Sequence, residues 1–199
     1  MNEYAIRHQI DYCISNSLIA IENRNADPSW FQQITQMANN LSRISVNLEN
    51  TKANVKYFGQ HQINRSAPQN RFSARQSMQS KNDTAVNLQQ YVLEQWQKVS
   101  RALQRERLKN PWTDNNQIEL INALVDNIES FQQLVSAKPS LIKSFLSRSD
   151  LRTEVSISQR ELTQIQMQPT TSLTSLILVL AFAIRMSSFL LVDQSNKKT

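Results

Sequence analysis

The side chains that most often carry catalysis or bind metals are few and widely spaced in this sequence. His8, His61 and Cys13 are the only imidazole and thiol groups among its 199 residues. Zinc sites need paired Cys or His ligands, and di-iron bundles need Glu-x-x-His pairs, and neither pattern occurs. The single glycine, Gly59, excludes a glycine-rich loop for phosphates. We therefore expect a non-enzymatic protein with no metal and no cofactor.

The composition favours helices. One Gly and five Pro leave few tight turns for β-hairpins, whereas the abundant Leu, Gln, Ala, Arg and Lys suit helices. The net charge of +6 favours anionic partners, either nucleic acid or anionic lipid. A lone cysteine provides no intramolecular disulfide, which is typical of a cytosol-facing protein. The expected fold is an all-α, antiparallel, coiled-coil-like bundle.

Helix signals organise the first part of the chain. An apolar stripe from Glu3 to about Asn23 predicts a first helix. Asp27 followed by Pro28 predicts the start of a second helix, and Gly59 predicts its end as a left-handed C-cap. The stretch from His61 to Asn82 has almost no apolar period, which predicts a mobile basic loop at about 60–82.

The second expected helix carries the most regular apolar repeat of the chain. Its apolar positions, with Thr51 among them, alternate between spacings of three and four residues. Such a seam must be covered by another helix, either within the chain or in a second copy, and an intramolecular bundle is the commoner solution. This predicted interaction seam consists of Ile34, Met37, Leu41, Ile44, Leu48, Val55 and Phe58.

Two further helices are expected in the middle of the chain. Asp83 or Thr84 is the expected cap of a third helix, which ends before Pro111. We expect Trp96 to anchor this helix in the core. A fourth helix is expected to begin at Thr113 or Asp114 and to end before Pro139.

The segment between Ser140 and Met167 gives weaker signals. Its first apolar residues suggest a short helix, and Asp150 is the expected cap of another. The stretch EVSISQ alternates like a strand, but no partner strand is evident, so a helix is preferred.

Basic residues mark possible anion contacts in two places. The dipole of the third helix already favours cations near its C-terminal end, so no ligand is needed to explain the basic residues there. The candidates are Arg65, Arg71 and Arg75 in the expected loop and Lys98, Arg101, Arg105 and Lys109 in the third helix.

The C-terminal stretch LTSLILVLAFAIRMSSFLLV is as long as a bilayer core is thick, about 30 Å as a helix. Its one charge, Arg185, costs about 3 kcal/mol in a bilayer, whereas its apolar residues contribute about −5 kcal/mol, so insertion is narrowly favoured. We expect this helix to stand apart from the bundle; the alternative is the buried central helix of a soluble bundle. The residues expected to contact lipid are Leu173, Leu176, Ile177, Leu178, Val179, Leu180, Phe182, Ile184, Arg185, Phe189, Leu190, Leu191 and Val192.

This arrangement resembles tail-anchored membrane proteins, in which a cytosolic domain precedes one C-terminal span. The resemblance is one of topology and covers about the last thirty residues. It implies a single-pass membrane protein whose N-terminal domain, 1–168, faces the cytosol. The membrane helix then occupies 169–193, and a short polar tail occupies 194–199.

Three functions are compatible with these features. The leading hypothesis is an oligomeric, membrane-anchored interaction protein, a scaffold, tether or adaptor, whose partners are the lipid bilayer and other proteins or copies of itself. The first alternative is a self-assembling pore-forming or membrane-disrupting protein, in which Thr174, Arg185 and Ser188 line a wet lumen. The second is a soluble helical protein that binds nucleic acid through its basic residues.

Overall fold

The protein is all-helical in the residues that the structure describes, which confirms the predicted fold class. The computed structural model describes residues 2–62, 71–147, 152–167 and 172–196, and side chains are described outside 53–86, 146–158, 167 and 193–196. Within these ranges the helices are α1 (Glu3–Asn23), α2 (Trp30–Gln62), α3 (Arg71–Lys109), α4 (Asn115–Asp126), α5 (Ile128–Ala137), α6 (Pro139–Ser147), α7 (Arg152–Met167) and α8 (Leu173–Asn196).

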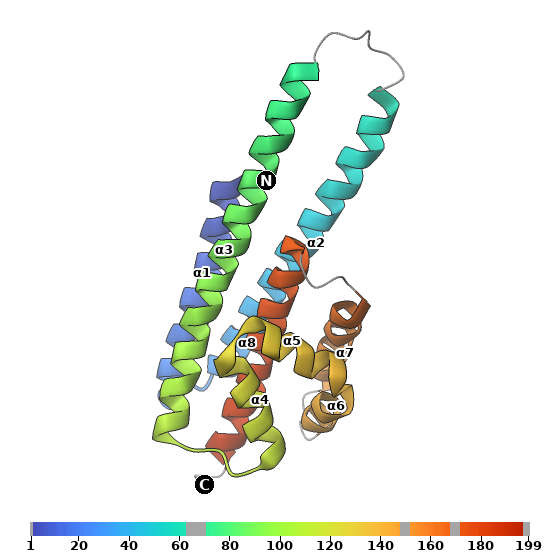
Figure 1. Cartoon of the computed structure of the whole chain (residues 1–199). Helices are drawn as coiled ribbons and strands as arrows, with labels where there is room; N and C mark the ends of the chain where they lie inside the picture. Colours follow the sequence, from blue (N-terminus) through green and yellow to red (C-terminus); the bar gives the residue numbers. More distant parts are fainter. Residues whose placement is uncertain (1, 63–70, 148–151, 168–171, 197–199) are drawn as a thin grey trace.

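The helices are arranged around α8. The two long helices, α2 and α3, run antiparallel on one side of α8, with α1 packed against both, and α4 to α7 lie on the other side (Figure 1). At 1.5 Å per residue, α2 is about 50 Å long, α3 about 58 Å and α8 about 36 Å. Both α2 and α3 project beyond the N-terminal end of α8 (Figure 1).

Polar side chains begin several helices as the sequence predicts. The Asn2 side chain accepts a hydrogen bond from the backbone N–H of Ala5 (2.8 Å), so α1 begins at Glu3. Asp27 accepts from the hydroxyl (2.7 Å) and the backbone N–H (2.8 Å) of Ser29, just before α2. These hydrogen bonds hold the pKa of the Asp27 carboxyl below its ordinary value, and the bond from the Ser29 hydroxyl has the largest effect. The predicted start of the first helix is confirmed, and the second helix begins at Trp30, two residues after the predicted Pro28.

The prediction of a loop at about 60–82 is wrong in the described residues. The helix α2 continues through Gly59 to Gln62, so this glycine is not a C-cap, and α3 begins at Arg71 rather than at Asp83 or Thr84. Residues 63–70 lie outside the described part of the chain. Helix propagation needs only local hydrogen bonds once a helix exists, so both helices extend beyond the core without an apolar stripe. Periodicity, which reports burial, could not reveal these extensions.

The predicted fourth helix is divided in two at Asn127. Asp114 caps α4 as expected, accepting from the N–H groups of Asn116 and Gln117. Asn127, however, has extended dihedrals (φ −162°, ψ 172°), and its side chain accepts from the N–H of Ser130 (2.8 Å), which starts α5.

The two helices predicted between Ser140 and Met167 are found, as α6 and α7. Pro139 opens α6, where its missing N–H costs no hydrogen bond. The stretch EVSISQ lies within α7, so the helix interpretation is confirmed over the strand. The predicted cap Asp150 lies outside the described residues.

The predicted seam of α2 is covered within the chain, mainly by α8 and α1. Ile34, Met37, Leu41 and Ile44 are buried, and Leu48 packs against the core. The side chains of Val55 and Phe58 lie outside the described part. Trp96 of α3 is also buried, as expected, with its ring 5.5 Å from that of Phe131.

The helix α8 lies inside the bundle, so the expectation that it stands apart from the other helices is wrong for this fold. It is apolar over most of its surface, and such a helix must be covered by apolar groups on most sides. Here α2, α3, α4, α5 and α7 supply them. Of the residues predicted to contact lipid, Leu176 and Val192 are partly buried and the others are buried. A separate membrane unit at 169–193 remains a prediction.

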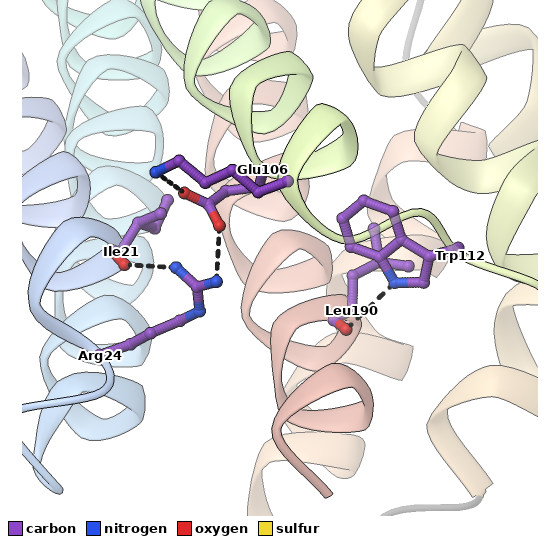
Figure 2. A network of polar contacts seen from close by, with 6 residues as sticks. Ile21, Arg24, Glu106, Trp112 and Leu190 are labelled. Carbon is purple, nitrogen blue, oxygen red and sulfur yellow. Dashed lines mark hydrogen bonds and ion pairs between the residues drawn. The ribbon is translucent and has the colours of Figure 1, made fainter. Parts of the chain in front are cut away.

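Two polar contacts fix the ends of the helices near the C-terminus of α8 (Figure 2). Arg24, at the end of α1, forms a buried ion pair with Glu106 of α3 (2.5 Å) and donates to the carbonyl oxygen of Ile21 (2.9 Å). The indole N–H of Trp112 donates to the carbonyl oxygen of Leu190 in α8 (3.4 Å). The segment after α3 is thereby held against the last turns of α8.

The continuation of α2 through Gly59 gives a direct test of the fold. Inside a helix, Gly is less favourable than Ala by about 0.5–1 kcal/mol. We expect Gly59→Ala to raise the free energy of unfolding by about that amount, measured by urea denaturation followed by circular dichroism. A decrease would instead indicate a left-handed C-cap at this position, because Ala tolerates positive φ poorly.

Candidate functional site

The candidate site is a polar network at the centre of the bundle, formed around the only charged residue between Leu173 and Val192. The side chain of Arg185 is fully buried. Its Nε donates to Oε2 of Glu161 and its Nη2 to Oε1 of the same carboxylate, both at 3.0 Å. Nη2 also donates to Oδ1 of Asn39 (2.7 Å), and the Ser42 hydroxyl donates to Oε1 of Glu161 (2.5 Å). These four residues are called the Arg185 network.

Three helices meet in the Arg185 network. Asn39 and Ser42 are three residues apart on α2 and therefore lie on one face of it. Glu161 comes from α7 and Arg185 from α8. The network thus joins the central helix to two of the helices that cover it.

The polar face of α2 continues toward the N-terminus of α8. The Ser45 hydroxyl donates to the carbonyl oxygen of Thr174 (2.8 Å). The Thr174 hydroxyl in turn donates to Oε1 of Glu49 (2.6 Å). This second contact fixes α8 against α2 about three turns away from Arg185.

The electrostatics of the network explain why a charge is stable in this core. Removing an ion from water costs several kcal/mol, and a paired ion recovers this cost only with close geometry and further hydrogen bonds. Arg185 has both, because two of its N–H groups meet the two carboxylate oxygens of Glu161 in the strong fork arrangement. The side chain of Glu161 is itself only 6% exposed. Each ion therefore depends on the other.

The predicted polar face of α8 exists, and it lies against protein in this structure. Thr174 and Arg185 are separated by about three helical turns, and Ser188 follows Arg185 by three residues, so the three share a face. All three are buried. Thr174 and Arg185 contact α2 and α7, whereas the Ser188 hydroxyl donates to the carbonyl oxygen of Arg185 (2.6 Å).

A groove of about 550 Å³ runs beside the network, between α2 and α7. Asn39, Ser42 and Glu161 lie along it together with the exposed Arg43 and Arg160. Water in this groove therefore reaches the edge of the network, while Arg185 remains behind it.

The basic residues predicted from the sequence are only partly brought together. Lys98, Arg101, Arg105 and Lys109 are exposed on α3. Lys98 lies 3.5 Å from Asp11, and Lys109 lies 3.4 Å from Glu106. The side chains of Arg71 and Arg75 lie outside the described set, as does Arg65 altogether.

Two of the three candidate ligands share one groove in the described residues. His8 and Cys13 line a small groove of about 310 Å³ between α1 and α2. Burial raises the pKa of the Cys13 thiol to about 11, so the nucleophilic thiolate is rare at neutral pH. The side chain of His61 is not among those described. Within the described part, no three His, Cys, Asp or Glu residues form a group able to hold a metal ion.

No protein-family model matches the sequence, and no curated protein or solved structure matches it. The fold and the contacts of its residues therefore carry the functional argument. They define a helical bundle around one apolar helix of bilayer length, whose single charge is neutralised by the bundle.

The sequence indicated Arg185 but missed its partners. Glu161 lies 24 residues away along the chain and Asn39 lies 146 residues away. A charge within an apolar stretch does imply a counter-charge if that stretch is buried in protein. The sequence offers many acidic residues, however, and spacing alone does not select Glu161.

A double-mutant cycle tests the dependence of Arg185 on Glu161. We expect Glu161→Leu to lower the free energy of unfolding by about 3–5 kcal/mol, because Arg185 then stays buried without a counter-ion. Combining it with Arg185→Leu should recover most of this loss. Urea denaturation measures both.

The exposed pair of Lys138 and Glu119 provides the control for this cycle. Glu119→Leu should cost less than about 1 kcal/mol, since surface ion pairs contribute little. A loss for Glu161→Leu no larger than this control, or a double variant no more stable than the single one, would contradict the described network.

Proposed function

We propose that the protein is a non-enzymatic, membrane-inserting helical protein that keeps its membrane helix, α8, inside its own bundle until insertion. The observation that supports this proposal is the combination found in α8. Its segment Leu173–Val192, 20 residues, is long and apolar enough to cross a membrane, and it is almost entirely buried. Its one charge is matched by Glu161 from another helix.

The proposal follows from the two environments that suit such a helix. A helix that is apolar on most sides needs apolar surroundings on most sides, and either a bundle or a bilayer supplies them. In the bilayer, the apolar residues outweigh the cost of Arg185 by about 2 kcal/mol. In the bundle, Arg185 keeps its hydrogen bonds to Glu161 and Asn39. The contacts of the Arg185 side chain therefore favour the state with α8 in the bundle over the state with α8 in the bilayer.

Insertion of α8 would give a single-pass protein with α1 to α7 facing the cytosol. The projecting parts of α2 and α3 (Figure 1) then form the element best placed to contact partners, as in a scaffold, tether or adaptor. The face of α2 that α8 covers, including Phe31, whose ring lies 5.7 Å from that of Phe189, would lose its cover. Exposed apolar faces of this kind promote association, so the inserted form is proposed to be oligomeric.

A pore is the second candidate function, and the polar face of α8 favours it. Thr174, Arg185 and Ser188 share one face, which could line a wet lumen if several inserted copies assemble. A pore would let small solutes cross the bilayer, whereas a membrane anchor would not.

Arg185→Leu is the variant that tests insertion. It removes the network and also removes about 3 kcal/mol of cost in the bilayer, so both effects favour the membrane. We expect a larger fraction of this full-length variant than of the wild-type protein to float with lipid vesicles after a carbonate wash.

Glu106→Leu is the matched control, because it breaks the buried ion pair with Arg24 and leaves the Arg185 network intact. It should destabilise the bundle without the gain in insertion shown by Arg185→Leu. An equal gain would show that any loss of stability suffices, which would refute the role of the network. If neither the wild type nor Arg185→Leu ever resists carbonate, the proposed function is wrong and α8 is only a core helix.

Leakage of a trapped dye distinguishes the pore from the anchor. A pore lined by Arg185 should release dye from vesicles in proportion to inserted wild-type protein, with less release per inserted molecule for Arg185→Leu. Carbonate-resistant insertion without leakage at any dose would eliminate the pore and leave the anchor.

A further inference from the structure

The last three turns of α3 present one continuous basic side to the solvent. Lys98, Arg101, Arg105 and Lys109 recur every three or four residues and are all exposed. Leu108 lies on the same side and is 80% exposed, the highest value among the exposed large apolar residues of the described part. These five residues are called the α3 basic face.

Carboxylates pair with the two end members of the α3 basic face, Lys98 and Lys109, whereas Arg101 and Arg105 form no ion pair among the described residues. The only acidic residue of α3 between Lys98 and Lys109 is Glu106, whose side chain is 4% exposed and pairs with Arg24 of α1 (Figure 2) and, at 3.4 Å, with Lys109. Asp11 of α1 approaches Lys98 at 3.5 Å, and both side chains are about half exposed. Such an exposed pair leaves most of the cation's field available to a partner.

We propose that the α3 basic face docks the protein on an anionic phospholipid surface, in a step that builds on the proposed function and precedes insertion of α8. Cationic side chains attract the negative surface of a cytosol-facing bilayer, and each contributes separately. The Leu108 side chain enters the apolar boundary beneath the headgroups while the neighbouring cations stay at the phosphates.

The exposed leucine selects lipid among the possible anionic partners. Nucleic acid attracts the same cations, but its single strands are bound on exposed aromatic rings, and its duplexes offer no apolar layer for a leucine. No aromatic residue occurs in α3 between Lys98 and Lys109. A largely exposed apolar side chain with cations beside it matches the layered chemistry of a membrane surface.

The position of the face also fits a step before insertion. The C-terminal ends of α3 and α8 lie at the same end of the molecule (Figure 1). Trp112, just after α3, donates its hydrogen bond to Leu190 of α8 (Figure 2). Docking through α3 therefore brings the end of the membrane helix close to the bilayer.

The test is binding of the full-length protein to vesicles of phosphatidylcholine with about 30% phosphatidylserine, compared with phosphatidylcholine alone. We expect binding only to the anionic vesicles, reversed by high salt before the carbonate-resistant state forms. Arg101→Gln combined with Arg105→Gln should weaken this binding about 30-fold. Leu108→Gln should weaken it about tenfold without changing its salt dependence.

The matched control removes two exposed cations elsewhere. Lys52→Gln with Lys143→Gln lowers the net charge equally but lies on α2 and α6. Equal weakening by the control would overturn the proposal, since net charge alone would then explain the binding. Unchanged affinity of the Arg101 and Arg105 variant for the anionic vesicles would also overturn the proposal. So would tighter binding to a single-stranded RNA than to the anionic vesicles, if Leu108→Gln had no effect on the RNA binding.

The docking step and the proposed function fail in different ways. Salt-reversible binding that depends on the α3 basic face, without any carbonate-resistant fraction, supports docking and refutes insertion. Carbonate-resistant insertion that is unaffected by the α3 basic face supports the proposed function and refutes docking.

Discussion

A guanidinium in the middle of an apolar helix is stable in this bundle because a carboxylate from another helix meets it with both oxygens. Arg185 and Glu161 exclude most of their water and replace it with each other and with Asn39 and Ser42. Neither ion is tolerable alone at this depth. The relative positions of α2, α7 and α8 therefore depend on one another, and α8 in turn carries the core around which the other helices pack.

The surrounding helices are built differently from the helix they cover. The covering helices α1 and α2 each bury an apolar stripe and keep polar residues on the outside, whereas α8 is apolar on most sides and has one buried polar face, with Thr174, Arg185 and Ser188. Such a construction holds in water as long as the cover is complete. The same α8, with its charge compensated by other means, is also suited to a bilayer, which is the basis of the proposed function.

The two ends of the molecule present different surfaces. At one end α2 and α3 both project beyond α8 (Figure 1). At the other end, α3 carries exposed cations around Leu108, next to the last turns of α8. This difference between the two ends fits the proposal that the protein approaches a membrane with its basic end and offers the projecting parts of α2 and α3 to partners.

The sequence by itself determined what local physics controls. Helix starts were predicted from capping residues such as Asp27 and Asp114, and the end of α3 was predicted from Pro111. The apolar stripe of α2 predicted its buried face. These signals are readable because each acts within a few residues. The helical course through Gly59 and the break at Asn127 escaped prediction, since a helix can continue without burial and a capping Asn resembles any other polar residue. Only the tertiary structure decided that α8 is covered by protein and that Glu161 and Asn39 neutralise Arg185. The residues of an apolar segment do not determine whether lipid or protein surrounds it, because both provide apolar contacts. A counter-ion from a distant helix comes into contact only once the chain has folded.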